Sequence, residues 1–337
     1  MKRALLRLSI PLREPFVTSS GVVLSRDLLV LRVEDGDGFV GFGEAAPFEP
    51  YDGVSIDEAA AALRAGLPSG SPPQARAAAE LAKLDLAARR EGRAVGQPGA
   101  DAIVVNRTLP AGPPEEAAKR AVDGLRAGYS CFKLKVGLPD DEIRVAAVRA
   151  AIGPWPALRL DANGAWSVED AIETIQRLRR YDLQLVEQPC ERLDELTEVR
   201  RAVDVPLCAD EPIRSADDVR IAAGLDACDI VNVKLAASGG FSGAREALRA
   251  AREEGLGAFV SSTLDGPWGI AAALQLAASE GLELACGLAT LDLFEAEIAR
   301  ALPQPRAGLL AVPEGPGLGV QVSAQALGEV LVEEVLN

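Results

Sequence analysis

The stretch Phe132-Lys133-Leu134-Lys135-Val136 is a short apolar run interrupted by two lysines, and similar short runs recur along the chain from residue 102 onward. Amphipathic helical stretches separate these runs, which is typical of strands that alternate with helices. The expected strands are Ala102–Val105, Phe132–Val136, Leu158–Asp161, Gln184–Glu187, Pro206–Ala209, Ile230–Leu235, Ala258–Ser261 and Glu283–Cys286. The clearest helical stretches between them are Pro114–Ala127, Val168–Arg180 and Gly243–Glu254. This alternation predicts an α/β protein with a modified TIM barrel of the (β/α)7β type, because no helix clearly follows the eighth strand.

Both ends of the chain read differently from this barrel pattern. Strand character at Ala4–Pro11, Leu28–Val33 and Phe39–Ala45 is followed by alanine-rich helical patterns at Ile56–Ala65 and Pro73–Arg90. We therefore expect an α+β capping domain over residues 1–100 and a barrel domain over residues 101–302. The Pro- and Gly-rich tail, residues 303–337, is expected to return to the capping domain.

Composition excludes several functional classes. The 337-residue chain contains no histidine, which rules out Ser-His-Asp and Cys-His catalysis and histidine-ligated zinc. A net charge of −15 disfavours nucleic acid and anionic membranes as partners. No apolar run is long enough to span a bilayer, and five scattered cysteines without a CxxC pair suggest reduced thiols and a cytoplasmic location. A small-molecule substrate is the expected partner, and homo-oligomerisation is left open.

Lysine placement points to acid–base chemistry. Only six of the 35 basic residues are lysine, and three of them, Lys133, Lys135 and Lys234, fall at the ends of expected barrel strands. Strand periodicity puts Lys133 and Lys135 on one face, and that face is the barrel interior because helices cover the outside. Two inward ammonium groups are expected to lower each other's pKa and make one of them a usable base.

Three acidic residues end three successive strands: Asp161, Glu187 and Asp210. Unpaired carboxylates buried inside a barrel are very costly, and a hard divalent cation removes that cost. Three carboxylates leave octahedral positions for water and substrate, as Mg²⁺ prefers, so the sequence predicts one magnesium site formed by these residues.

This constellation resembles the enolase superfamily, in particular its muconate-lactonizing branch, over essentially the whole chain. Within that branch the flanking segments most resemble the o-succinylbenzoate synthases of menaquinone biosynthesis. The segments that carry this finer resemblance are Val186-Glu187-Gln188-Pro189-Cys190, Ala209-Asp210-Glu211-Pro212-Ile213-Arg214, Ser261-Ser262-Thr263-Leu264-Asp265 and Ala285-Cys286-Gly287-Leu288. After Leu264-Asp265 the family pattern has small polar residues, where this chain has Gly266-Pro267-Trp268.

The resemblance implies roles for these residues in a Mg²⁺-dependent syn-dehydration through an enediolate. Lys135 is implied as the base, Lys133 as its electrostatic partner and Lys234 as an ammonium over the opposite face. Glu211 is expected to pair with Lys234, and Asn163 to lie just outside the metal ligands. The implied substrate-binding residues are Ser20, Tyr51, Ser262 and Gly287, with the loops around Thr18–Val23 and Phe48–Gly53 enclosing the substrate.

Two other readings stay open. Lysines on both faces also suit a racemase or epimerase that moves a proton between the two faces of one carbon, acting on N-acylamino acids or dipeptides. The segment Cys286–Asp292 lacks the Asp-x-Asp that dipeptide epimerases of this branch use to hold a substrate ammonium, which disfavours dipeptides. A metal-dependent binding scaffold without turnover is the non-enzymatic alternative.

Overall fold

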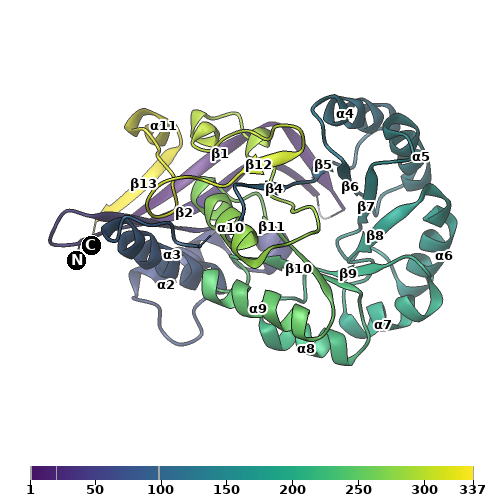
Figure 1. The fold of residues 1–337 in the computed structure, drawn as a ribbon, viewed down its shortest axis with the longest axis horizontal. Helices are drawn as coiled ribbons and strands as arrows, with labels where there is room; N and C mark the ends of the chain where they lie inside the picture. The colour runs from purple at the N-terminus through teal and green to yellow at the C-terminus, as the bar shows by residue number, and fades with distance from the viewer. Residues whose placement is uncertain (1, 20, 98, 337) are drawn as a thin grey trace.

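The computed structural model describes residues 2–19, 21–97 and 99–336, and its centre is a curled parallel sheet (Figure 1). Adjacent strands follow chain order and pair in parallel, as helical crossovers between them require. The strands are β5 (Arg107–Leu109), β6 (Cys131–Lys135), β7 (Ala157–Asp161), β8 (Leu183–Glu187), β9 (Leu207–Ala209), β10 (Ile230–Lys234) and β11 (Gly257–Ser261). The predicted fold class, a modified TIM barrel with a separate N-terminal sheet, is confirmed.

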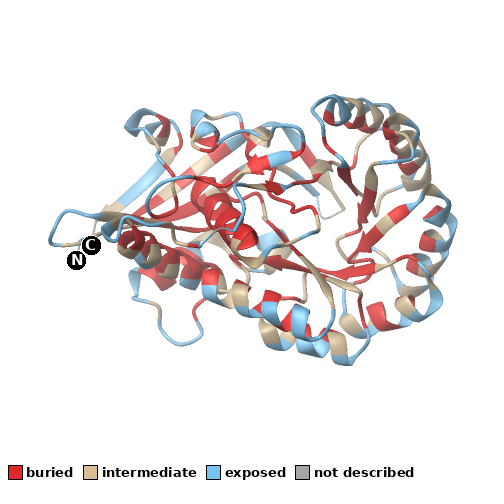
Figure 2. Ribbon diagram, viewed as in Figure 1, coloured by how far each residue is buried: buried red, intermediate tan, exposed pale blue. Residues whose placement is uncertain are grey.

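The crossover helices cover the outside of this sheet and expose only their outer faces (Figure 2). They are α4 (Pro114–Arg126), α5 (Asp141–Ile152), α6 (Val168–Leu178), α7 (Leu193–Ala202), α8 (Ala216–Gly224), α9 (Phe241–Glu253) and α10 (Pro267–Glu280). Helix α10 differs from the others because every residue from Pro267 to Ala278 is buried. Its apolar, alanine-rich sequence fits this position, since α10 packs against both the barrel strand β11 and β3 of the N-terminal sheet.

The predicted first and eighth barrel strands need correction. Residues Ala102–Val104 (β4) pair antiparallel with β12 (Leu309–Ala311), and the parallel sheet begins instead at β5. Residues 283–285 form no strand. The barrel is closed by single bridges, Val105 to Cys286 and Ser261 to Gly287. The apolar pattern at 102–105 reflects pairing with the distant tail, whereas the true first strand is short and polar.

The N-terminal sheet has the order β13-β1-β2-β3. Its strands are β1 (Lys2–Thr18), β2 (Gly21–Glu34), β3 (Val40–Ala45) and β13 (Leu331–Leu336), and the short helix α11 (Ala324–Gly328) precedes β13. Helices α1 (Glu49–Asp52), α2 (Ile56–Arg64) and α3 (Pro73–Arg90) follow β3. The tail thus returns to this sheet as expected, while the boundaries at residues 100 and 302 stay a prediction.

Helix α3 lies very close to β3, which explains its alanine-rich sequence. A side chain at Gly43 would place a Cβ 2.0 Å from the Ala78 carbonyl oxygen, so only glycine fits there. This tight contact holds α3 against β3.

Two barrel helices receive their N-terminal caps from the N-terminal unit. Helices α9 and α10 begin after Gly240 and Gly266, which have no side chain to cap them. The carboxylate of Glu44 (β3) accepts hydrogen bonds from the backbone N–H groups of Gly266 (2.7 Å) and Gly269 (3.2 Å). Glu80 (α3) accepts the N–H of Ser242 at 3.2 Å. Both side chains therefore satisfy free N–H groups at helix starts across the seam between the two units.

Glu44 also makes the stability of the fold depend on pH. Burial, with Asp265 nearby, raises the pKa of Glu44 to about 8. The folded state therefore holds a proton that Glu44 in the unfolded chain releases near its ordinary pKa of 4.5. The contribution of this proton to the free energy of unfolding is fully present below about pH 4.5 and is lost as the pH rises through about 8. The melting temperature of the wild-type protein should fall between pH 5 and pH 9. In Glu44→Gln, whose side chain is neutral at every pH, this fall should be smaller. Glu49→Gln on exposed α1 is the matched control, and parallel melting profiles for all three proteins would contradict the expectation.

The five cysteines are buried and unpaired, as expected for small core residues. Burial raises the pKa of every one of these thiols. Among the described residues, no helix has the length and apolar character needed to cross a membrane.

Candidate active site

The carboxyl ends of neighbouring strands bring the predicted charged residues to one level of the barrel. In the sheet register Lys135 lies opposite Asp161, and Asp161 lies opposite Glu187. Asp210 follows β9 directly, and Lys234 is the last residue of β10. Alternation along each strand turns these side chains inward, so Asp161, Glu187 and Asp210 are buried.

Lys133 and Lys135 share one carboxylate on one side of the pocket. Their Nζ atoms lie 2.9 and 2.6 Å from Oδ2 of Asp161. Lys133 also reaches Glu187 Oε1 at 3.0 Å, deeper in the barrel, whereas Lys135 donates to Oδ1 of Asn163 at 2.7 Å. Of the two lysines, Lys135 is therefore the one bound by a side-chain amide, that of Asn163, at the pocket wall.

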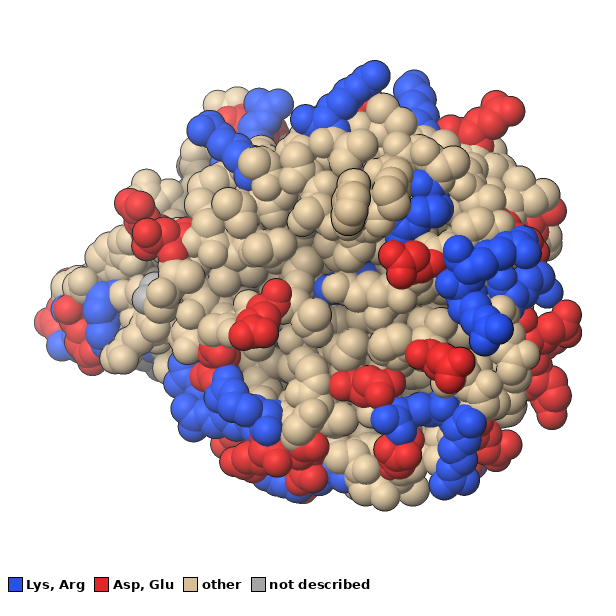
Figure 3. Space-filling view, turned by 45° about the vertical axis from the view of Figure 1, so that its right-hand side comes forward, with Lys and Arg blue, Asp and Glu red and all other residues tan. Residues whose placement is uncertain are grey.

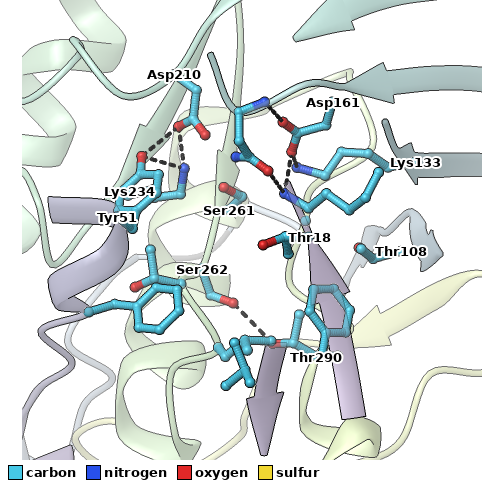
Figure 4. Close-up of a pocket in the computed structure, with 18 of the residues that line it drawn as sticks. Thr18, Tyr51, Thr108, Lys133, Asp161, Asp210, Lys234, Ser261, Ser262 and Thr290 are labelled. Atoms are coloured by element: carbon cyan, nitrogen blue, oxygen red, sulfur yellow. Dashed lines mark hydrogen bonds and ion pairs between the residues drawn. The ribbon is translucent and has the colours of Figure 1, made fainter. Parts of the chain in front are cut away.

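Lys234 occupies the opposite side of the pocket, together with Asp210 and Tyr51 (Figure 4). Its Nζ donates to Oδ1 of Asp210 and to the Tyr51 hydroxyl at 2.8 Å, and the Tyr51 hydroxyl donates to Asp210 at 3.0 Å. The same ammonium lies 4.4 Å from the centre of the Tyr51 ring. Tyr51, which was predicted to bind substrate, also joins α1 to the Lys234–Asp210 pair through its hydroxyl.

The predicted pairing of Glu211 with Lys234 is wrong. Asp210 takes the lysine, and Glu211 Oε1 accepts a hydrogen bond from Asn163 Nδ2 at 2.9 Å. Consecutive residues after a strand point in different directions, and the sequence does not show which of two neighbouring acids faces the barrel axis. The contact orients Asn163, whose amide oxygen then faces Lys135.

The expectation that the two strand lysines lower each other's pKa is wrong for Lys133. Burial alone would lower the pKa of Lys133, but the attraction of Asp161 and Glu187 outweighs it and raises that pKa. The same ion pairs hold the pKa of Asp161 below its ordinary value although burial opposes this. Glu187 shows the reverse, because burial and the Asp161 charge raise its pKa to about 7.

The structure also qualifies the predicted magnesium site. Within the described part of the chain, no three acidic or cysteine side chains are arranged around a point at which a metal could bind. Lysine ammonium groups bind the carboxylate oxygens in this structure and neutralise their charge. The donor set still fits a hard divalent cation, since it consists of buried carboxylates from neighbouring strand ends.

The pocket between the two lysine groups has a charged floor and an apolar wall. Its described lining consists of Phe16, Thr18, Val23, Phe48, Pro50, Tyr51, Thr108, Lys133, Lys135, Asp161, Asn163, Asp210, Lys234, Ser261, Ser262, Thr263, Leu264, Gly287 and Thr290. Both expected N-terminal loops contribute to it. On the face shown in Figure 3, acidic and basic side chains are interspersed, and other residues cover most of its upper middle.

Three of the four predicted substrate-binding residues line this pocket: Tyr51, Ser262 and Gly287. Ser20 lies outside the described residues. Gly287 is required by space, because a Cβ there would lie 2.7 Å from the Cβ of Ser261. Thr108 and Thr290 were missed, since Thr108 belongs to the unrecognised strand β5 and Thr290 follows the irregular closing segment. The hydroxyls of Thr290 and Ser262 lie 3.0 Å apart, so these two residues form one polar patch on the pocket wall.

The unusual Gly266-Pro267-Trp268 segment packs between the barrel and the N-terminal sheet and does not line the pocket. Pro267 occupies the first turn of α10, and Trp268 is buried with its ring 5.8 Å from that of Phe42 on β3. At Gly266 a side chain would lie 2.8 Å from the Glu44 carboxylate. The departure from the family pattern therefore matches the close docking of α10 on the N-terminal sheet.

Known proteins share this arrangement. Residues 116–326 match the family described as Enolase C-terminal domain-like. The chain is 38% identical to o-succinylbenzoate synthase of Thermobifida fusca (strain YX), over 96% of this chain and 90% of that protein. It is 30% identical to D-Ala-D/L-Ala epimerase of Cytophaga hutchinsonii, over 92% of each chain. The crystal structure of a dipeptide epimerase from Cytophaga hutchinsonii, complexed with Mg and D-Ala-L-Val, has a TM-score of 0.90 at 28% identity and covers 100% of this chain and 99% of its own.

The chain belongs to the enolase C-terminal domain-like family. Its relatives are o-succinylbenzoate synthases and muconate-lactonizing and epimerase members of the enolase superfamily, so the resemblance in the sequence is confirmed.

Proposed function

We propose that the protein is a Mg²⁺-dependent o-succinylbenzoate synthase that dehydrates a succinyl-hydroxycyclohexadiene carboxylate in menaquinone biosynthesis. The observation that carries the proposal is the composition of the pocket. Among its described lining residues the acids are Asp161 and Asp210, and lysine ammonium groups bind both. A substrate with a free ammonium finds no available carboxylate, whereas an anionic substrate with an apolar ring fits the lysines and the wall formed by Phe16, Val23, Phe48 and Leu264.

A second observation points the same way. Asp292, the acid in the segment after the closing bridges, forms an ion pair with Arg107 and does not line the pocket. A dipeptide epimerase needs an acid to bind the amino terminus of its substrate, so this pairing disfavours dipeptides. The 38% identity to the Thermobifida fusca synthase supports the dehydratase reading further.

In this proposal the lysines have separate roles, with Lys133 as the electrostatic partner of Lys135. Lys135, as a neutral amine, takes the proton from the carbon next to the substrate carboxylate, and the C–H electrons form an enediolate. The C–O bond at the neighbouring carbon then breaks, and the proton held by Lys135 leaves with the hydroxide as water while the ring becomes aromatic. Lys234 stays an ammonium on the opposite side and stabilises the negative charge. A Mg²⁺ held by Asp161, Glu187 and Asp210 would supply positive charge at the substrate carboxylate.

An N-acylamino acid racemase is the second candidate, because Lys135 binds Asp161 and Lys234 binds Asp210, and these two acids lie on opposite sides of the pocket (Figure 4). Proton removal by one lysine and return by the other inverts a stereocentre. An N-acylated substrate has no free ammonium, so it needs no acidic side chain in the pocket to bind one.

Side-by-side assays decide between the two functions. We expect the cyclohexadiene precursor of o-succinylbenzoate to be turned over at least about 100-fold more efficiently than a panel of N-succinyl amino acids, measured as kcat/KM. Efficient turnover of the amino acids alone would reject the synthase assignment. Comparable values would establish one enzyme with both activities.

A further inference from the structure

Arg26, on β2, is a buried arginine whose guanidinium binds backbone carbonyls from both sides of the seam. Its Nε donates to the carbonyl of Thr263 at 3.1 Å, in the barrel loop that follows β11. Its Nη1 and Nη2 donate to the carbonyls of Pro47 (2.9 Å) and Ala46 (3.3 Å), in the loop that leaves β3. One rigid side chain thus holds two loops that come from different units of the protein.

Both of these loops supply pocket wall, although Arg26 itself does not line the pocket. Phe48 follows Pro47, and its ring lies 4.6 Å below the Arg26 guanidinium. Phe48, Thr263 and Leu264 all line the pocket. The guanidinium therefore fixes the ring from behind through a cation–π contact and fixes the facing loop through a hydrogen bond.

The barrel loop that Arg26 holds is strained. Leu264 adopts a φ of 60°, in the left-handed region that residues other than glycine rarely occupy. Strain of this kind persists only where surrounding contacts impose it. Here Asp265 accepts from the N–H (3.1 Å) and hydroxyl (3.0 Å) of Thr263, while Arg26 binds the Thr263 carbonyl from the other side.

We propose that Arg26 is a positioning residue for substrate selection, which sets the distance between Phe48 and the Thr263–Leu264 loop and so the width of the apolar pocket wall. The three carbonyls lie in different directions around the guanidinium, a pattern that the five N–H groups of arginine can match and the single ammonium of lysine cannot. Substrates that fill this wall lose binding when the loops separate, while the lysines that perform the chemistry keep their own partners. The proposal rests on the proposed function only in the choice of substrate.

The test compares Arg26→Lys and Arg26→Met with Arg32→Met, a control on the same strand whose arginine pairs with Glu34 at the surface. Hydrogen exchange of the backbone amides of Ala46, Phe48 and residues 263–266 is measured on each protein whose melting curve shows cooperative folding. KM and kcat are measured in parallel for whichever substrate of the panel the wild-type enzyme turns over.

We expect amide exchange in both segments to rise about tenfold in Arg26→Met and less in Arg26→Lys, with no change in Arg32→Met. KM should rise about tenfold in Arg26→Met while kcat changes by less than about threefold, with partial rescue by Arg26→Lys. A merely structural arginine would instead lower the amount of folded enzyme and leave KM unchanged.

Unchanged exchange in a folded Arg26 variant would overturn the proposal, and so would raised exchange with an unaltered KM. If Arg26→Met does not fold, the same two criteria apply to Arg26→Lys. Failure of the proposed function shows separately, as absence of turnover of the cyclohexadiene substrate by the wild-type protein.

Discussion

Lys135→Ala should reduce turnover to background, a loss of at least about 10²–10⁴-fold, because a positioned general base contributes that much and Lys135 acts in both proton steps. The sequence contains no histidine that could replace it. Lys135→Arg should be nearly as inactive, since a guanidinium keeps its proton at working pH. Steady-state assays of dehydration measure both losses.

Two controls separate this expectation from a general loss of structure. Lys119→Ala, on the exposed face of α4, should keep wild-type activity. In D₂O, substrate recovered from a Lys234→Ala reaction should still show exchange at the carbon next to the carboxylate, because Lys135 removes that proton. A Lys135→Ala enzyme that retains dehydration would disprove the assignment of the base.

Removal of divalent cations should have an effect of similar size. The carbon acid of the substrate is too weak for an amine base unless positive charge stabilises the enediolate, and a bound cation contributes several kcal/mol to this. We expect exhaustive chelation to abolish turnover and Mg²⁺ to restore it. Asp161→Asn and Asp210→Asn should prevent the recovery, because each removes one carboxylate from the expected ligand set.

The cation must displace the lysines that bind these carboxylates in the structure. Its binding can be measured separately from turnover, as a change in melting temperature. Mg²⁺ should raise the melting temperature of the wild-type protein and of Asp217→Asn, a control on the exposed first turn of α8. It should not raise that of Asp161→Asn. An enzyme that is indifferent to chelator, with equal melting shifts in all variants, would refute the magnesium assignment.

The fold was predictable from sequence because its signals are local. Short apolar strands and amphipathic helices such as α6 carry their periodicity within about ten residues, and parallel pairing follows from the crossovers. The two failures, at residues 102–104 and 283–285, concern segments whose partners lie far away in sequence. Residues 102–104 pair with a strand that begins at Leu309, and Cys286 closes the barrel through single bridges.

The candidate site was predictable as a set of residues but not as a set of contacts. Strand ends and the alternation of side chains are sufficient to bring Lys135, Asp161 and Glu187 together. The partner of Lys234 depended on the direction in which Asp210 and Glu211 point, and on a tyrosine that arrives from α1. The role of Arg26 was invisible for the same reason, because its hydrogen-bond acceptors are backbone carbonyls that leave no trace in sequence.

The carboxylates of Glu44 and Glu80 that cap helices α10 and α9 constrain how chimaeras of this family can be built. A recombinant that takes its first 95 residues from a relative would keep the barrel intact in sequence, yet two of its helices would begin with uncompensated N–H groups. Exchange of the N-terminal segment should therefore succeed only when the donor supplies acids at both places. Evolution of substrate range by exchange of the N-terminal segment would then be limited first by the capping of these two helices. The shape of the pocket would matter only in exchanges that meet this requirement.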